Sequence, residues 1–268
     1  MTTMRRVIIL GVAAALVGAA GIAFLSLSKE KPVPASTDAA ATISAEELTQ
    51  VASLNVLFGH QSVGRNILDG VSAVYAANQV AGPPITELVD GSGSPGTGIA
   101  HAAIGKNGDP LGKLVAFDTL LRSGAAAGID VAFLKLCYVD IRWNTDVEAL
   151  FAEYVRTFDA LERDFPDIEF IHVTTPLTTG PANLKDQVKV LIGRNDNIAR
   201  ERYNDKLREH YGDDAVFDLA AVEGTAPDGS RRGTLYQGYS SDGAHLNPEG
   251  SAAVATSLLR MLAAKRTS

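Results

Sequence analysis

The stretch NVLFGHQSVGRNIL, residues 55–68, runs from a short apolar segment through a polar turn into a segment with helical character. The apolar part, NVLF, is typical of a strand that is buried on both faces of a sheet. The polar part, GHQSVG, places a histidine, a glutamine and a serine between two glycines. In open α/β sheets, ligands bind beyond the carboxyl ends of the strands. We therefore expect His60, Gln61 and Ser62 at the functional edge of such a sheet.

The rest of the chain from about residue 45 to 266 continues this alternation of apolar strands with helices. Apolar runs predict strands at 55–58, 85–89, 131–137, 169–174 and 215–219, and helical patterns occur at 64–79, 110–123, 145–164, 194–211 and 247–264. A Ser-x-x-Glu capping box at 44–47 predicts a helix that opens the domain. Alternation of this kind predicts an α/β fold, a three-layer α/β/α sandwich around a parallel five-stranded sheet, flavodoxin-like in type. Residues 90–109 are expected to form a Gly-rich loop.

The N-terminus carries a targeting segment. Arg5 and Arg6 precede an uncharged apolar stretch that continues to residue 28. About 20 apolar residues are enough to cross a bilayer as a helix, and the preceding arginines favour a cytoplasmic N-terminus. Residues 1–28 are expected to be a signal anchor or a cleaved signal peptide, two alternatives that the sequence leaves open. Residues 29–44 form a linker, and the domain at 45–266 is expected outside the cytoplasmic membrane, anchored to it or secreted or periplasmic.

Composition excludes several classes of protein. The chain of 268 residues has a net charge of −7 and no basic run, which argues against a nucleic-acid surface. Its only cysteine, Cys137, cannot form an intrachain disulfide, so the fold depends on its core. No cluster of histidine, cysteine and acidic residues has metal-ligand spacing, and we expect neither a metal nor a cofactor.

Asp242 and His245 lie three residues apart in SSDGAHLNPEGS, residues 240–251, just before a helix. A carboxylate at this spacing can hold one ring nitrogen of the histidine, which leaves the other nitrogen as a general base. Ser62 is the best-placed hydroxyl for such a base, and its amide at a helix N-terminus would stabilise an oxyanion. The chain has no G-x-S-x-G motif, which disfavours a standard α/β-hydrolase. The residues predict a Ser-His-Asp mechanism.

Together these motifs resemble the SGNH (GDSL-like) hydrolase superfamily over nearly the whole domain. The segment DGAHLNP is similar to the family's C-terminal Asp-x-x-His motif, GKNGD at 105–109 to its second block, and FGHQSVG to its first. The resemblance implies an SGNH-hydrolase-like sandwich, ester hydrolysis through Ser62, and an oxyanion held by the Gly108 N–H. The chain departs from the family at CYVD, residues 137–140, where Val139 replaces the oxyanion asparagine.

Four polar residues are candidates to compensate for that departure. Asn107 and Lys135 are the expected substitute oxyanion donors, although the lysine stem could equally pack in the sheet with its ammonium reaching solvent. His60 and Gln61, which immediately precede the serine, are expected to belong to a rearranged oxyanion or substrate site. Losing one oxyanion donor costs about 3 kcal/mol of transition-state stabilisation, so an active enzyme needs such a substitute.

Three functions stay open on the sequence alone. The first is a serine hydrolase, or an O-acyltransferase using the same residues, that acts on a small-molecule or polysaccharide acyl ester. The second is a non-catalytic envelope protein that binds a glycan or a protein. The third is metal-dependent hydrolysis through His60, His245 and Asp242. A membrane is a further partner if the N-terminal helix is not cleaved.

Overall fold

The computed structural model describes residues 42–89, 96–181 and 183–265. The expected targeting segment at 1–28 and nearly all of the expected linker at 29–44 lie outside these residues. In the described part of the chain, no helix is both long and apolar enough to cross a membrane. The first helix opens with the predicted capping box, in which Ser44 and Glu47 each accept a backbone N–H of the other. This pairing satisfies amides that a helix start otherwise leaves without partners.

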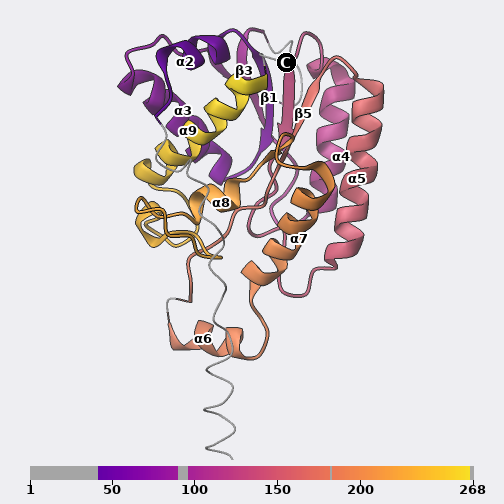
Figure 1. Cartoon of the computed structure of the whole chain (residues 1–268). Coiled ribbons are helices and arrows are strands. Elements are labelled where there is room, and N and C mark those ends of the chain that lie inside the picture. The colour runs from indigo at the N-terminus through magenta and orange to yellow at the C-terminus, as the bar shows by residue number, and fades with distance from the viewer. Residues whose placement is uncertain (1–41, 90–95, 182, 266–268) are drawn as a thin grey trace, which may run out of the picture. The chain divides into compact units, whose positions relative to one another are not determined.

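Helices and strands alternate through the domain (Figure 1). In chain order they are α2 (Ala45–Ala52), β1 (Asn55–His60), α3 (Val63–Ala77), β2 (Ile85–Glu87), β3 (Gly98–Ala103), α4 (Pro110–Leu120), η3 (Leu121–Ala125), β4 (Val131–Leu134), α5 (Val147–Asp164), β5 (Glu169–Val173), α6 (Leu184–Leu191), α7 (Asp196–Tyr211), β6 (Val216–Phe217), α8 (Leu219–Glu223), η4 (Gln237–Tyr239) and α9 (Pro248–Lys265). All five predicted strands and all five predicted helices are present, with ends shifted by a few residues.

The strands form one parallel sheet in the order β2-β3-β1-β4-β5-β6. Strand β1 lies in the interior of this order, and the chain adds β2 and β3 on one side of it before it crosses to β4 on the other. The carboxyl end of β1 is therefore a topological switch point, where open α/β sheets bind their ligands. Ser62 follows β1 directly.

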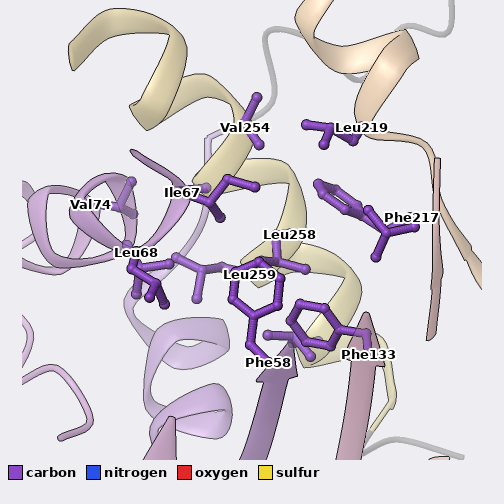
Figure 2. Packing of buried hydrophobic residues seen from close by; sticks show 14 of the residues in the cluster. Phe58, Ile67, Leu68, Val74, Phe133, Phe217, Leu219, Val254, Leu258 and Leu259 are labelled. Carbon is purple, nitrogen blue, oxygen red and sulfur yellow. The ribbon is translucent and has the colours of Figure 1, made fainter. Parts of the chain in front are cut away.

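Helices cover both faces of the sheet. Successive side chains along each strand point to opposite faces and therefore enter two separate cores. Helices α2, α3, α8 and α9 pack on one face, and α4, α5 and α7 on the other. The strand residues divide accordingly: Val56, Phe58, Val131, Phe133, Ile171 and Val173 face the first core, and Leu57, Ala132, Leu134 and Phe170 face the second. Figure 2 shows the first core, where phenylalanines of β1, β4 and β6 meet aliphatic side chains of α3 and α9. The three-layer α/β/α prediction is confirmed.

The predicted number of strands was one too low. Residues Gly98–Ala103 are not part of a loop but form β3, which pairs with β1 from Asn55↔Gly98 to His60↔Ala103. Apart from Ile99, the sequence GIAHAA lacks the β-branched and aromatic residues that favour strands. Ala100 and Ala102 are buried, and β3 lies between β1 and β2, so tertiary pairing overrides the weak local preference. Consequently His101 lies in a buried strand rather than in a Gly-rich loop.

Candidate active site

Ser62 stands at the turn between β1 and α3 in a strained conformation. Its backbone has φ 50° and ψ −107°, a region that residues with a side chain rarely adopt. Ser62 occupies the N-cap position of α3, yet its side chain makes no capping hydrogen bond. A serine in this position normally accepts an amide hydrogen of the first helical turn. Strain of this kind persists where the surrounding structure enforces it, and here it accompanies a hydroxyl directed elsewhere.

The hydroxyl of Ser62 is directed at His245. Its Oγ lies 2.5 Å from His245 Nε2, and His245 Nδ1 lies 2.6 Å from Asp242 Oδ2. The loop before α9 thus brings a histidine and a carboxylate to a serine that is 183 residues away in the chain. A hydroxyl, an imidazole and a carboxylate in this order form the geometry by which a serine is activated as a nucleophile.

The carboxylate of Asp242 is fixed by its own loop. Its Oδ1 accepts the backbone N–H of His245 at 2.8 Å and that of Ala244 at 2.9 Å. The Ser240 hydroxyl donates to the His245 carbonyl oxygen at 2.6 Å, which closes the turn from the other side. The backbone hydrogen bond from His245, followed by the bond to its side chain, lowers the pKa of Asp242 well below its usual range. Asp242 is therefore ionised at neutral pH and holds the imidazole by charge as well as by geometry.

The oxyanion role that the family resemblance implied for Gly108 differs from its contact in the structure. The Gly108 N–H donates to Asp140 Oδ1 at 2.7 Å, so it is already engaged. Asp140 also accepts the Cys137 N–H and the Lys113 ammonium, both at 2.6 Å. The buried carboxylate of Asp140 thereby ties the loop after β3 to the loop after β4. In this geometry Gly108 supports the site and offers no free donor to it.

Asn107 differs from Gly108 because the NH₂ group of its side-chain amide remains available as a donor. Its Oδ1 accepts the Lys113 ammonium at 2.9 Å, which turns the oxygen inward. The Asn107 side chain is otherwise exposed on the loop after β3. Lys135, the other expected substitute, is fully buried and donates to Cys137 Sγ at 3.3 Å. Its ammonium reaches neither solvent nor the surface of the site, so of the two only Asn107 remains a candidate donor.

His60 and Gln61 are turned away from the space in front of Ser62. The His60 ring is buried, and its Nε2 lies 3.2 Å from His101 Nδ1. Gln61 Nε2 donates to the Gly105 carbonyl oxygen at 2.9 Å. Both side chains join the turn after β1 to β3 and the loop that follows it. Their contacts therefore do not indicate a direct role in substrate binding. Within the described residues, no three histidine, cysteine or acidic side chains gather at metal-binding distance.

Comparisons with known proteins agree with the architecture. No protein-family model and no curated protein matches the chain. Among solved structures, it is similar to a Streptococcus pneumonia protein provisionally described as a platelet activating factor, with 17% identity, a TM-score of 0.51, and coverage of 81% of this chain and 91% of that one. It also matches a provisionally assigned lipolytic protein of the G-D-S-L family from Desulfitobacterium hafniense DCB-2, with 12% identity, a TM-score of 0.45 and coverage of 77% and 99%. An acetyl xylan esterase matches with 18% identity, a TM-score of 0.39 and coverage of 76% and 96%.

The chain shares its fold with the Streptococcus pneumonia protein, and at 17% identity this likeness is one of fold alone. The three-layer α/β fold that the resemblance of the motifs implied is confirmed. The sheet has six strands, one more than predicted.

Sequence reasoning missed Tyr138, which contacts the general-base candidate. Its ring meets the His245 ring edge-on, with centroids 5.7 Å apart. Burial, and then the charge of Asp242, raise the pKa of Tyr138. Arg200 of α7 holds the same residue by donating from Nε to the Tyr138 carbonyl oxygen at 2.7 Å. The position of Tyr138, directly beside the valine that departs from the family motif, is the one signal that could have identified it.

Because His60 and His101 are both buried, we expect acid to destabilise the domain. Burial lowers the pKa of His60 from 6.5 to about 3, and burial also lowers that of His101. The unfolded chain therefore binds a proton that the folded chain excludes, so stability is full above about pH 6.5 and declines as pH falls toward 3. We expect His60 alone to remove about 1.4 kcal/mol per pH unit in this window. Urea unfolding between pH 7 and pH 4 measures the slope.

Two variants test whether His60 causes the loss of stability at low pH. His60→Phe should flatten the profile, because it removes the titrating ring and keeps an aromatic side chain beside Phe58. His210→Ala, at an exposed histidine, should leave the profile as it is in the wild type. A His60→Phe profile as steep as that of the wild type would assign the acid sensitivity to other groups.

Because Gly64 has no side chain, the turn after β1 can pack against the His60 ring. A Cβ at this position would overlap the His60 ring, which is itself held in the core. We expect Gly64→Ala to lower the free energy of unfolding by about 1–3 kcal/mol, as overpacked cores do. Gly180→Ala, where a Cβ meets no atom within 4 Å, is the matched control and should change stability little. Chemical denaturation of both variants measures the difference, and equal stabilities would contradict the packing argument.

Proposed function

We propose that this protein is a serine esterase that hydrolyses an O-acyl ester. The observation that carries the proposal is the continuous chain of short contacts from Ser62 Oγ through the His245 ring to Asp242. Each group has the neighbour that its role requires: the hydroxyl faces a base, and the base faces a fixed carboxylate. The SGNH-like fold is consistent with this arrangement, since it places the serine at the switch point of the sheet.

In the proposed reaction, Ser62 Oγ attacks the ester carbonyl carbon while His245 Nε2 takes the hydroxyl proton. The collapse of the tetrahedral intermediate breaks the bond to the alcohol, which leaves with the proton that His245 returns. Water then attacks the acyl-serine with the same histidine as base, which releases the acid and restores the hydroxyl. Asp242 stays ionised throughout and stabilises the imidazolium that forms in each step.

The oxyanion of the intermediate forms beside the start of α3. The first amides of a helix have no partner within it, and the helix dipole adds partial positive charge there. The Ser62 N–H is the first proposed donor, and the Asn107 amide group, with its oxygen held by Lys113, is the second. Asn107 would then take the place of the asparagine that Val139 replaces.

The substrate proposed for this site is an acyl ester carried by an envelope polysaccharide or glycan. The targeting segment predicted at residues 1–28 would place the domain outside the cytoplasmic membrane, where such polymers occur. The catalytic side chains are open enough for a bulky ester, since His245 is 41% and Asp242 56% exposed. Transfer of the acyl group to a glycan hydroxyl in place of water would use the same residues.

The full chain, assayed with an aryl acetate and with a fluorophosphonate probe, tests the proposal. We expect turnover, and one covalent adduct that peptide mapping assigns to Ser62. Adding a chelator should leave both unchanged, because no residue role in the proposal needs a metal. A protein that neither turns over nor labels, but still retains an acylated glycan in a binding assay, would instead be a non-catalytic glycan-binding protein.

A further inference from the structure

Exposed apolar side chains are concentrated in one region of the surface. Of the ten large apolar side chains that the described part of the chain leaves exposed, seven are Trp143 or fall within residues 184–198. Leu184 is 75%, Leu191 78% and Ile192 61% exposed. Large apolar patches on a monomer mark places where it meets another surface. We define the α6 patch as Leu184, Val188, Leu191, Ile192 and Trp143.

The spacing within the patch is that of an amphipathic helix. Leu184, Val188 and Leu191 follow one another at intervals of four and three residues, so they form one stripe along α6, and Ile192 continues it. Lys185 and Lys189 follow the first two stripe residues by one position each and therefore flank the stripe. Figure 1 shows α6 set apart from α7 and from the sheet. None of the buried residues of the two cores belongs to α6, so this helix is not explained by the packing of the domain.

The chain on either side of α6 is joined to loops at the carboxyl end of the sheet. Before α6, the Thr179 N–H donates to the Gly243 carbonyl oxygen at 2.9 Å, and Gly243 follows Asp242 in the catalytic loop. After α6, Asp196 Oδ1 accepts the backbone N–H of Trp143 at 2.9 Å. The guanidinium of Arg194 lies 4.9 Å from the centre of the Trp143 ring, which joins a cation to the apolar side chains. The segments that flank α6 are therefore joined to the loop before α9 and to the loop after β4.

We propose that the α6 patch docks on an anionic phospholipid bilayer. Interfacial helices combine an aliphatic stripe with flanking lysines and a nearby tryptophan, and the patch has all three. Charge complementarity favours an anionic surface, because residues 184–198 carry three cations, Lys185, Lys189 and Arg194, against two carboxylates, Asp186 and Asp196, in a chain whose net charge is −7. The stripe enters the interface, and the cations lie at the level of the lipid phosphates. The docking does not depend on catalysis, but it would place the esterase site at the membrane surface.

The single tryptophan of the chain provides a direct test, because Trp143 belongs to the patch. The full chain is reconstituted with vesicles that contain brominated phosphatidylglycerol in phosphatidylcholine, and Trp143 emission is recorded. The expected result is strong quenching that weakens at high salt, since screening removes the electrostatic part of the attraction. Absence of quenching, or equal quenching in brominated phosphatidylcholine alone, would overturn the assignment. The readout reports the patch itself, whether or not residues 1–28 also hold the protein on the vesicle.

Matched variants connect the quenching to α6. Leu184→Glu with Leu191→Glu should lower the partitioning of the patch about ten-fold or more, whereas Val115→Glu, at a residue of α4 that is 63% exposed, should not change it. Circular dichroism checks that each variant is folded. Equal quenching in both variants would refute the proposal. Sedimentation that shows a dimer of the wild type and a monomer of the α6 variant would assign the patch to contact between copies of the chain and also overturn it.

Discussion

Replacing Ser62 with alanine is expected to lower kcat/KM for an aryl acetate by about 10⁴-fold or more. The reason is that the His245 base then has no hydroxyl to deprotonate, since Ser62 Oγ is the group 2.5 Å from its Nε2. His245→Ala is expected to cost about as much, because the serine hydroxyl is a weak nucleophile without its base. Initial rates at several substrate concentrations, on protein whose folding is checked by circular dichroism, give both values.

The combination of the two changes is the sharper result. Residues that act as one unit lose their contribution together, so the double variant should be no slower than the worse single variant. Ser72→Ala is the matched control, since this serine lies in the same helix and its hydroxyl donates to the Leu68 carbonyl oxygen. If losses at Ser62 and His245 multiply, or if Ser62→Ala keeps wild-type rates, the proposed mechanism fails.

The three residues that would carry this chemistry could be identified from sequence because each has a local signal. Ser62 follows an apolar strand, and Asp242 and His245 share a turn before a helix. The family resemblance then joined two segments that periodicity alone cannot connect. What no pattern indicated is the distance between Ser62 and His245, which depends on how α9 packs back against α3.

The supports of the site were harder to predict, because they are pairs between distant segments. Nothing in GKNGD or CYVD indicates that the Gly108 N–H donates to Asp140, or that Lys113 of α4 donates to both Asp140 and Asn107. Strand β3 escaped prediction for a related reason, since its alanines become a strand only through pairing with β1. Local sequence determines elements and turns, whereas these contacts depend on the assembled sheet.

The buried pair of Lys113 and Asp140 is expected to give the largest loss of stability among single polar substitutions. Their side chains are 1% and 0% exposed, and Nζ lies 2.6 Å from Oδ2. Asp140→Asn removes the charge that the buried ammonium requires and turns an amide donor toward groups that are themselves donors. Breaking a buried pair in this way costs about 3–5 kcal/mol. Thermal unfolding should show Tm lowered by about 10 °C for a domain of this size.

Two further variants separate this pair from an ordinary ion pair. Lys113→Met combined with Asp140→Asn should be more stable than the sum of the two single changes predicts, because no unpaired charge is then left in the interior. Arg65→Met, which breaks the ion pair to Glu87 at the surface, should cost about 1 kcal/mol or less. Additive losses at Lys113 and Asp140, or a cost at Asp140 no greater than that at Arg65, would contradict the argument. A non-additive result would show that the loop carrying Asn107 and Gly108 is held in place by a charge pair in the core, beyond the reach of solvent.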